Sequence, residues 1–271
     1  MDINLKNLLP KIIPTRNKYE AGFVVGLSGS LGMYGACKLS ALAALKTGSG
    51  IVKVITNREI PSAFYELVNL IIDYSKTGEI LKNINSSDCC FIGPGLGRDK
   101  KVSKLLLKIL PKIKVKTILD ADALYFLSKN LNCSLPKEIV FTPHLYEMQR
   151  LLNEKVIGEE LIEKTEKFSK EHEVIIVLKG NPTIIFAPDK KSSIIMNGDP
   201  GLASAGTGDV LTGMIASFAA QKMDLYDASM LAVNMHFMAS KLAAKDLSSY
   251  NLMASDVIKY LPKVFLQILN N

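Results

Sequence analysis

The stretch FVVGLSGSLGMYGACKLSALAALKTGSGIVKVI, residues 23–55, decides the fold. Its apolar runs at 23–25 and 51–55 predict two strands, and residues 35–46 between them predict a helix. A glycine-rich turn over 26–32 separates the first strand from this helix. Strand, turn, helix and strand in this order predict two parallel strands joined by a right-handed crossover.

The same alternation continues along most of the chain. Further apolar runs predict buried strands at 89–92, 117–119, 139–141 and 174–178. Runs at 183–187 and 192–196 predict an antiparallel hairpin at one edge of the sheet, and residues 209–271 are expected to be helical. We therefore expect an α/β fold in a single domain over residues 1–271, with a mostly parallel central sheet, helices on both faces and a small edge hairpin.

Composition narrows the function classes. The formal net charge is +7, but the lysines are scattered and tryptophan is absent, so nucleic acid is not an expected partner. No stretch approaches the ~18 uncharged apolar residues of a membrane span, and charges interrupt the apolar residues before Pro14, so neither a span nor a signal peptide is expected. The cysteines form no CxxC pair, which predicts reduced thiols and a cytoplasmic protein.

The most informative motif is the turn Ala205-Gly206-Thr207-Gly208-Asp209, which precedes an apolar segment. The following helix would point its free N–H groups and positive dipole end into this turn, so that Gly206, Thr207 and Gly208 would form an anion hole. Such a site suits a transferring phosphoryl group, and Asp209 could accept a proton from a substrate hydroxyl. Considered alone, however, such a turn is more often structural, with Thr207 or Asp209 acting only as a helix N-cap.

Other polar loops follow predicted strands, at the sheet edge where open parallel sheets bind ligands. Lys179 and the residues after it could reach a nucleotide phosphate, or could form only a turn into the hairpin. Asp120 and Asp122 could hold Mg²⁺ or a substrate hydroxyl, or Asp122 could cap a helix. His144 could contact a polar ligand, and Glu147 could begin a helix.

Two familiar nucleotide motifs are missing. Neither the turn at 26–32 nor Gly93-Pro94-Gly95-Leu96-Gly97 has the G-x-G-x-x-G spacing of a dinucleotide site, and no Gly-Lys-Ser/Thr occurs, so a Walker-type phosphate loop is excluded. The three histidines suggest no metal site, and the metal ligands cannot be identified from the sequence.

Together, and in this order, the motifs resemble the ADP/ATP-dependent NAD(P)H-hydrate dehydratase family of the ribokinase-like superfamily, over roughly residues 21–261. The most specific segments are NGDPGLA at 197–203, GTGDVLTGM at 206–214 and IGPGLG at 92–97. VLKG at 177–180 and LDADAL at 119–124 agree as well. The resemblance implies a ribokinase-like three-layer sandwich.

The resemblance also implies repair of a damaged coenzyme. NADH hydrate or NADPH hydrate, in its S epimer, would be phosphorylated on the ring hydroxyl and would then lose phosphate, with Mg²⁺ and with ADP or, less expected, ATP as donor. Asp209 would be the base and a hydrate ligand. Ala36, Gly95 and His144 would line the hydrate pocket. The nucleotide site would consist of Lys179, Gly180, Asn181, Pro182, Thr183 and Gly208. A homotetramer and an NAD(P)H-hydrate epimerase partner, fused or separate, are also implied.

Two segments depart from the family pattern. Residues 17–22 lack the usual histidine, and Leu145-Tyr146 stand where Pro-Gly usually follows His144. These changes concern substrate contacts more than the reaction type. The alternative is a ribokinase-like kinase of a vitamin precursor such as hydroxyethylthiazole or hydroxymethylpyrimidine, which would share the glycine turn and its aspartate. A nucleotide-binding regulator is disfavoured by the intact Asp209, and a hydride-transfer oxidoreductase by the missing dinucleotide fingerprint.

Overall fold

The apolar runs build one central sheet. The computed structural model describes residues 4–196 and 198–270, and within them nine strands pair in the order β3-β2-β1-β4-β5-β6-β7-β8-β9. The strands are β1 Phe23–Leu27, β2 Ile51–Thr56, β3 Val68–Ile71, β4 Cys89–Ile92, β5 Lys116–Leu119, β6 Ile139–Phe141, β7 Ile175–Leu178, β8 Thr183–Ala187 and β9 Lys190–Ile195. Strands β1 to β7 pair in parallel, while β8 and β9 are antiparallel, which confirms the edge hairpin.

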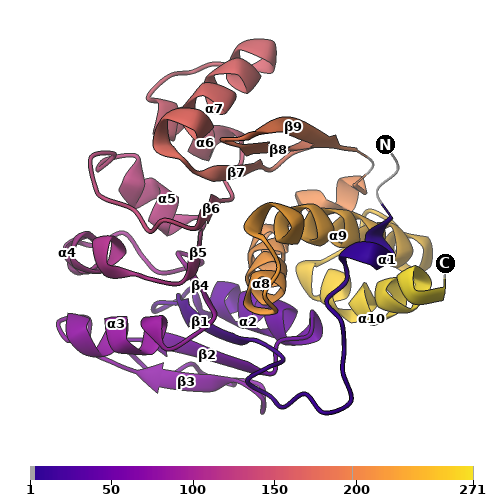
Figure 1. Ribbon diagram of the computed structural model, residues 1–271, viewed down its shortest axis with the longest axis horizontal. Coiled ribbons are helices and arrows are strands. Elements are labelled where there is room, and N and C mark those ends of the chain that lie inside the picture. Colours follow the sequence, from indigo (N-terminus) through magenta and orange to yellow (C-terminus); the bar gives the residue numbers. More distant parts are fainter. Residues whose placement is uncertain (1–3, 197, 271) are drawn as a thin grey trace.

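Helices cover both faces of this sheet (Figure 1). One layer holds α3 Thr77–Asn85, α4 Lys100–Ile109, α5 Asp122–Leu127, α6 Leu145–Leu152 and α7 Gly158–His172. The opposite layer holds α2 Tyr34–Lys46, α8 Thr207–Ala220, α9 Leu225–Leu247 and α10 Ala254–Asn270, with the short α1 Leu5–Leu8 against α9 and α10. Side chains alternate between the two faces of each strand, so Cys89 and Phe91 enter one core and Cys90 and Ile92 the other. The predicted α/β three-layer arrangement is confirmed, whereas the single domain over residues 1–271 stays a prediction.

Two local predictions were wrong or incomplete. Strand β3 was missed, because this edge strand leaves Val68 and Ile71 exposed and buries no residue, so its sequence lacks a buried apolar run. Gly26 was expected in the turn but lies inside β1. The reason is steric, because a Cβ on Gly26 would come 2.3 Å from the Phe91 ring of β4.

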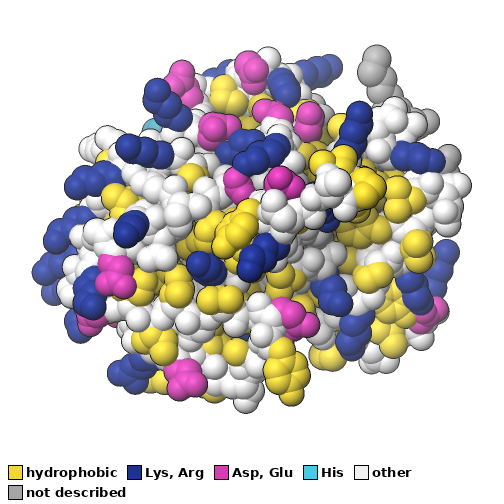
Figure 2. Space-filling model, turned by 60° about the horizontal axis from the view of Figure 1, so that its bottom comes forward, with side chains coloured by type: hydrophobic (Ala, Val, Ile, Leu, Met, Phe, Trp, Pro, Cys, Tyr) yellow, Lys and Arg dark blue, Asp and Glu magenta, His cyan; other side chains and the backbone are white. Residues whose placement is uncertain are grey.

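The surface carries mixed charges. Lys and Arg side chains spread over the face drawn in Figure 2, with acidic side chains between them. None of the helices in the described part of the chain combines the length and the apolar character that crossing a membrane requires. The four cysteines are free thiols, and three of them are buried.

Helices α2 and α8 approach each other closely at Gly213, where a Cβ would lie 2.0 Å from the Ser40 carbonyl oxygen. We expect Gly213→Ala to lower the free energy of unfolding by about 1–3 kcal/mol, because the clash is with backbone and cannot be relieved by a rotamer change. Urea unfolding measures this change. The control Gly78→Ala, on α3 with open space around it, should raise stability by up to about 1 kcal/mol. Equal effects of the two substitutions would contradict the packing argument.

Candidate active site

A glycine in the left-handed region begins the helix that carries Asp209. Gly206 has a φ of +93° and is the N-cap of α8, without a side-chain hydrogen bond to the helix. The Thr207 hydroxyl donates instead to the carbonyl oxygens of Leu202 and Ser204, at 2.8 and 3.0 Å. The interpretation of Thr207 or Asp209 as a simple N-cap is therefore wrong. Among the described residues the first N–H groups of α8 have no partner, so they can bind an anion.

The Asp209 carboxyl lies in the first turn of α8 and is only partly exposed. Burial and the nearby carboxylate of Asp120 raise its pKa to about 7, against the opposing charge of Lys179. A Cβ on Gly206 would come 2.5 Å from the Leu39 side chain of α2 and 3.9 Å from Asp209 Oδ2, so the turn that carries Asp209 packs against α2. Burial, with a smaller contribution from the Asp209 charge, raises the pKa of Cys37 on α2 to about 11. A carboxyl with a pKa near neutrality is suited to act as a general base.

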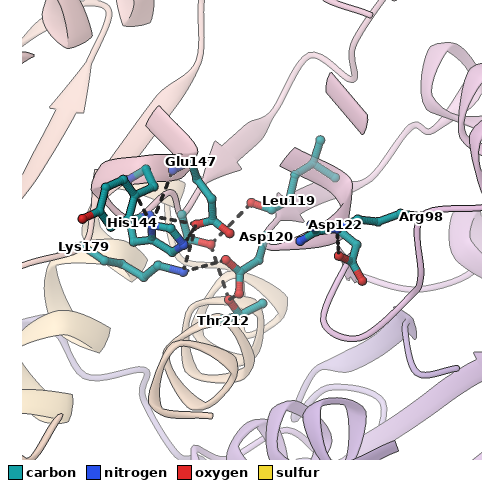
Figure 3. A network of polar contacts seen from close by, with 10 residues as sticks. Arg98, Leu119, Asp120, Asp122, His144, Glu147, Lys179 and Thr212 are labelled. Carbon is teal, nitrogen blue, oxygen red and sulfur yellow. Dashed lines mark hydrogen bonds and ion pairs between the residues drawn. The ribbon is translucent and has the colours of Figure 1, made fainter. Parts of the chain in front are cut away.

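A buried ion network lies beside this turn (Figure 3). Lys179 Nζ is 2.8 Å from Asp120 Oδ1 and 3.8 Å from Glu147 Oε2. The second Asp120 oxygen accepts a hydrogen bond of 2.8 Å from the Thr212 hydroxyl on α8. Burial acts to lower the pKa of Lys179, but the two carboxylates outweigh burial and raise it, so the lysine stays charged. A Cβ on Gly208 would lie 3.2 Å from Nζ, which places this cation at the open end of α8.

The two aspartates after β5 do not act as a pair. Asp120 faces Lys179 and Thr212, whereas Asp122 binds Arg98 Nε at 2.6 Å and accepts from the Gly97 N–H at 2.9 Å (Figure 3). The hypothesis that these carboxylates jointly hold Mg²⁺ is therefore not supported. Over residues 4–196 and 198–270, no group of three His, Cys, Asp or Glu side chains is arranged to hold a metal ion.

A cavity of about 430 Å³ lies next to the open end of α8, a volume typical of small-molecule sites. It brings together most of the predicted nucleotide residues with the helix start: Lys179, Gly180, Asn181, Thr183, Thr207 and Gly208. Pro182 belongs to the same turn but does not line the cavity. Gly198 and Asp199 contribute to the wall, and Asn197 of the same motif lies outside the described residues.

The residues predicted for the hydrate pocket lie in two places at the carboxyl edge of the sheet. Ala36 and Gly95 are neighbours, because a Cβ on Gly95 would come 3.2 Å from the Ala36 Cβ. His144 is the N-cap of α6 and forms a capping box with Glu147. Burial and the charge of Lys179 lower the pKa of His144, so the ring that lies near Glu147 is neutral. His144 thus joins the ion network through Glu147, and its role toward a substrate stays a prediction.

Two residues of the cavity escaped the sequence analysis. His236 and Phe237 of α9 also line this cavity. His236 is buried, its Nε2–H donates to the Thr207 carbonyl oxygen at 3.1 Å, and burial lowers its pKa to about 4. A histidine within an apolar helix gives no local signal of such a position, because core histidines have the same pattern.

The fold and site together define a ribokinase-like α/β protein with a nucleotide-sized cavity at the start of a helix. The profile of a family described as NAD(P)H-hydrate dehydratase matches residues 24–263. The ADP-dependent (S)-NAD(P)H-hydrate dehydratase of Staphylococcus aureus is 33% identical, with 96% of this chain and 94% of that protein covered. The chain therefore belongs to the NAD(P)H-hydrate dehydratase family.

Longer relatives and solved structures agree with this assignment. The bifunctional NAD(P)H-hydrate repair enzyme Nnr of Moorella thermoacetica is 33% identical, but the chain covers only 52% of its length. The ADP/ATP-dependent NAD(P)H-hydrate dehydratase of Bacillus subtilis, co-crystallised with ATP and Mg²⁺, is similar with a TM-score of 0.82 and 28% identity, over 97% of this chain and 96% of that one. A hydroxyethylthiazole kinase from Pyrococcus horikoshii (TM-score 0.63, 15% identity, 95% and 91% covered) shares the fold alone.

Proposed function

We propose that this chain repairs NADH hydrate or NADPH hydrate by nucleotide-dependent dehydration. The observation that carries the proposal is Asp209, a partly buried carboxyl with a pKa of about 7 at the open end of α8. The cation Lys179 and a cavity of nucleotide size lie beside it. Family membership supports the substrate, and the S epimer and ADP as donor are proposed from the relatives with that name.

The proposed chemistry has two steps. Asp209 removes the proton from the ring hydroxyl while the hydroxyl oxygen attacks the terminal phosphorus of the donor. The bridging P–O bond to that phosphorus breaks, so AMP is released from ADP, or ADP from ATP. The N–H groups of Thr207 and Gly208 and the Lys179 ammonium stabilise charge on the transferring group. In the second step the C–O bond of the phosphorylated ring breaks, phosphate leaves, and the neighbouring ring carbon loses a proton, which restores the coenzyme.

Mg²⁺ fits this proposal as a companion of the nucleotide. The described carboxylates form no three-ligand cluster, and Asp120, Glu147 and Asp122 already face cations. Mg²⁺ usually keeps several waters and binds to phosphates with one or two carboxylates, so Asp209 and the Asp199 carboxylate in the cavity wall are the groups available to approach it. When bound, the ion would neutralise phosphate charge.

The remaining features of the proposal concern the cellular setting. We propose a cytoplasmic homotetramer, on the basis of the free cysteines and the family. We also propose an epimerase partner, because the bifunctional relatives are about twice as long as the part this chain matches. The kinase alternative is not favoured, since its solved representative shares the fold at only 15% identity.

Recovery of reduced nicotinamide absorbance tests the function. The protein would be incubated with purified NADH hydrate or NADPH hydrate, Mg²⁺ and either ADP or ATP. We expect recovery with at least one donor, and release of AMP or ADP in equal amount. No recovery with either donor would refute the dehydratase, and phosphorylation of hydroxyethylthiazole instead would favour the kinase.

The pH dependence follows from the raised pKa of Asp209. A base must be ionised to accept a proton, so kcat/KM should fall about tenfold per pH unit below a pKa near 7. Asp120→Asn removes a charge that raises this pKa, so the acid limb should move to lower pH in that variant. Profiles of both proteins between pH 5 and 9 measure the effect. A kcat/KM of the unaltered protein that stays constant down to pH 5 would contradict the assignment.

A further inference from the structure

A second cavity, of about 540 Å³, lies on the outer surface between α5 and α6. We call it the α5–α6 groove. The side chains that give it chemical character are Tyr125, Lys129, Tyr146, Arg150, Glu154 and Lys155. None of them belongs to the nucleotide cavity next to Gly208, so the groove is a separate space.

The α5–α6 groove begins at the candidate active site. Tyr146 follows His144 closely, and the two rings meet edge to face with centroids 6.0 Å apart. At the other wall, the Arg98 guanidinium that binds Asp122 also lies 4.3 Å from the centre of the Tyr125 ring. The charge of Arg150 contributes to lowering the pKa of both His144 and Tyr125. The groove therefore runs outward from His144, one of the residues predicted to line the hydrate pocket.

The groove is basic. Lys129, Arg150 and Lys155 line it, and Glu154, its one carboxylate among the lining residues, is paired with Lys164 of α7. Arg150 and Lys155 form no ion pair within the described part of the chain. An arginine and a lysine without carboxylate partners are suited to bind phosphate, the arginine through two parallel hydrogen bonds.

The groove also has an exposed aromatic face. Tyr146 is 63% exposed, whereas the Tyr125 ring is already contacted by Arg98 and by Lys129, 4.4 Å from its centre. Tyr146 can therefore stack on a base, while Tyr125 holds two cations in place. A purine and phosphate groups are the chemistry that such a groove recognises.

We infer that the α5–α6 groove binds the adenosine half of the dinucleotide substrate, with Tyr146 against adenine and with Arg150 and Lys155 on the 2′-phosphate. The inference rests on the proposed function. In that function the hydrated ring lies near Asp209, and the rest of the bound substrate extends past His144 into the groove. The contacts of Arg150 and Lys155 with the 2′-phosphate make the chain selective for NADPH hydrate over NADH hydrate.

Kinetics with both hydrates test this selectivity. Arg150→Met and Lys155→Met should each raise KM for NADPH hydrate at least about tenfold, the usual scale of a charge-assisted contact, with kcat nearly unchanged. KM for NADH hydrate should change less than about threefold, because it lacks the 2′-phosphate. The control Lys108→Met removes an exposed lysine from the last turn of α4, one that has no ion pair with any residue the structure describes, and should alter neither. Equal KM changes for both hydrates would overturn the inference.

A binding measurement separates the inference from the proposed function. With ADP present to fill the nucleotide cavity, calorimetry would compare adenosine 2′,5′-bisphosphate with AMP. We expect tighter binding of the bisphosphate, lost in Arg150→Met and kept in Lys108→Met. Bisphosphate binding that does not depend on Arg150 overturns the inference even if the protein repairs hydrates. Conversely, absence of repair by the unaltered protein refutes the proposed function. The bisphosphate measurement then tests by itself whether the groove binds an adenosine phosphate.

Discussion

Asp209→Asn is expected to lower kcat for hydrate repair at least ~10²-fold at pH 8, the usual scale for loss of a general base. Asparagine keeps the size of the side chain but cannot accept the proton of the ring hydroxyl. The Gly206 turn and the open end of α8 should be unchanged, because Gly206, not Asp209, is the N-cap. Nucleotide binding, measured by calorimetry with ADP, should therefore remain.

Stability distinguishes this loss of a base from a loss of fold. Because burial raises the pKa of Asp209 from 3.8 to about 7, its ionisation costs the folded state free energy. The cost is full above pH 7, shrinks as the pH falls, and disappears only below the ordinary carboxyl pKa of 3.8. Asp209→Asn should then be at least as stable as the unaltered protein at pH 8. Near-normal turnover in this variant would remove Asp209 from the mechanism.

Asp256→Asn is the matched control. Asp256 occupies the corresponding first turn of α10, where its carboxylate accepts from the Met253 N–H and binds Lys259. Its replacement should lower the free energy of unfolding by about 0.5–2 kcal/mol, as for a lost capping interaction, and should leave kcat unchanged. The two aspartates hold the same place in the first turn of a helix but have opposite expected effects, so this place in the helix alone does not distinguish them.

The sequence was sufficient to predict most strands of the sheet and the loops at its carboxyl edge. Buried parallel strands need continuous apolar runs, so β4 and β6 were predicted with their observed bounds, and so was the antiparallel but fully buried β8. Strand β3 lacks that requirement, because it lies at the edge and is exposed. A continuous apolar run therefore reveals the buried strands but misses an edge strand such as β3, in which no residue is buried.

The pairing of charges in the site could not be predicted. Asp120 and Asp122 are two residues apart, yet one faces Lys179, 59 positions later, and the other faces Arg98 in a different loop. Which cation each carboxylate meets depends on how neighbouring strands place their loops, and sequence spacing carries no information on that. The same holds for His236, which reaches the cavity only because α9 packs beside α8.

Lys179→Met is expected to destabilise the protein by about 3–5 kcal/mol at pH 8, the scale for removing one partner of a buried ion pair. The Lys179 ammonium lies between Asp120, which is 1% exposed, and Glu147, which is 7% exposed. Without it, two buried carboxylates face each other with no cation. Thermal or urea unfolding measures the loss, and Lys167→Met serves as control, because its exposed pair with Glu171 is worth less than about 1 kcal/mol.

The pH and a second substitution show whether unpaired charge causes this loss. In Lys179→Met the two carboxyls should have pKa values raised above those of the unfolded chain, so the destabilisation should shrink as pH falls and protons neutralise them. Adding Asp120→Asn removes one of the two charges and should recover part of the stability at pH 8. Asp120→Asn alone, in contrast, leaves the Lys179 ammonium without its nearest carboxylate and destabilises the protein. A loss that is equal at pH 5 and pH 8 and unrelieved in the double variant would mean that Lys179 contributes packing of its aliphatic stem. In that case the charge of Lys179 is free to act on the nucleotide, and the Asp120 and Glu147 carboxylates only position it.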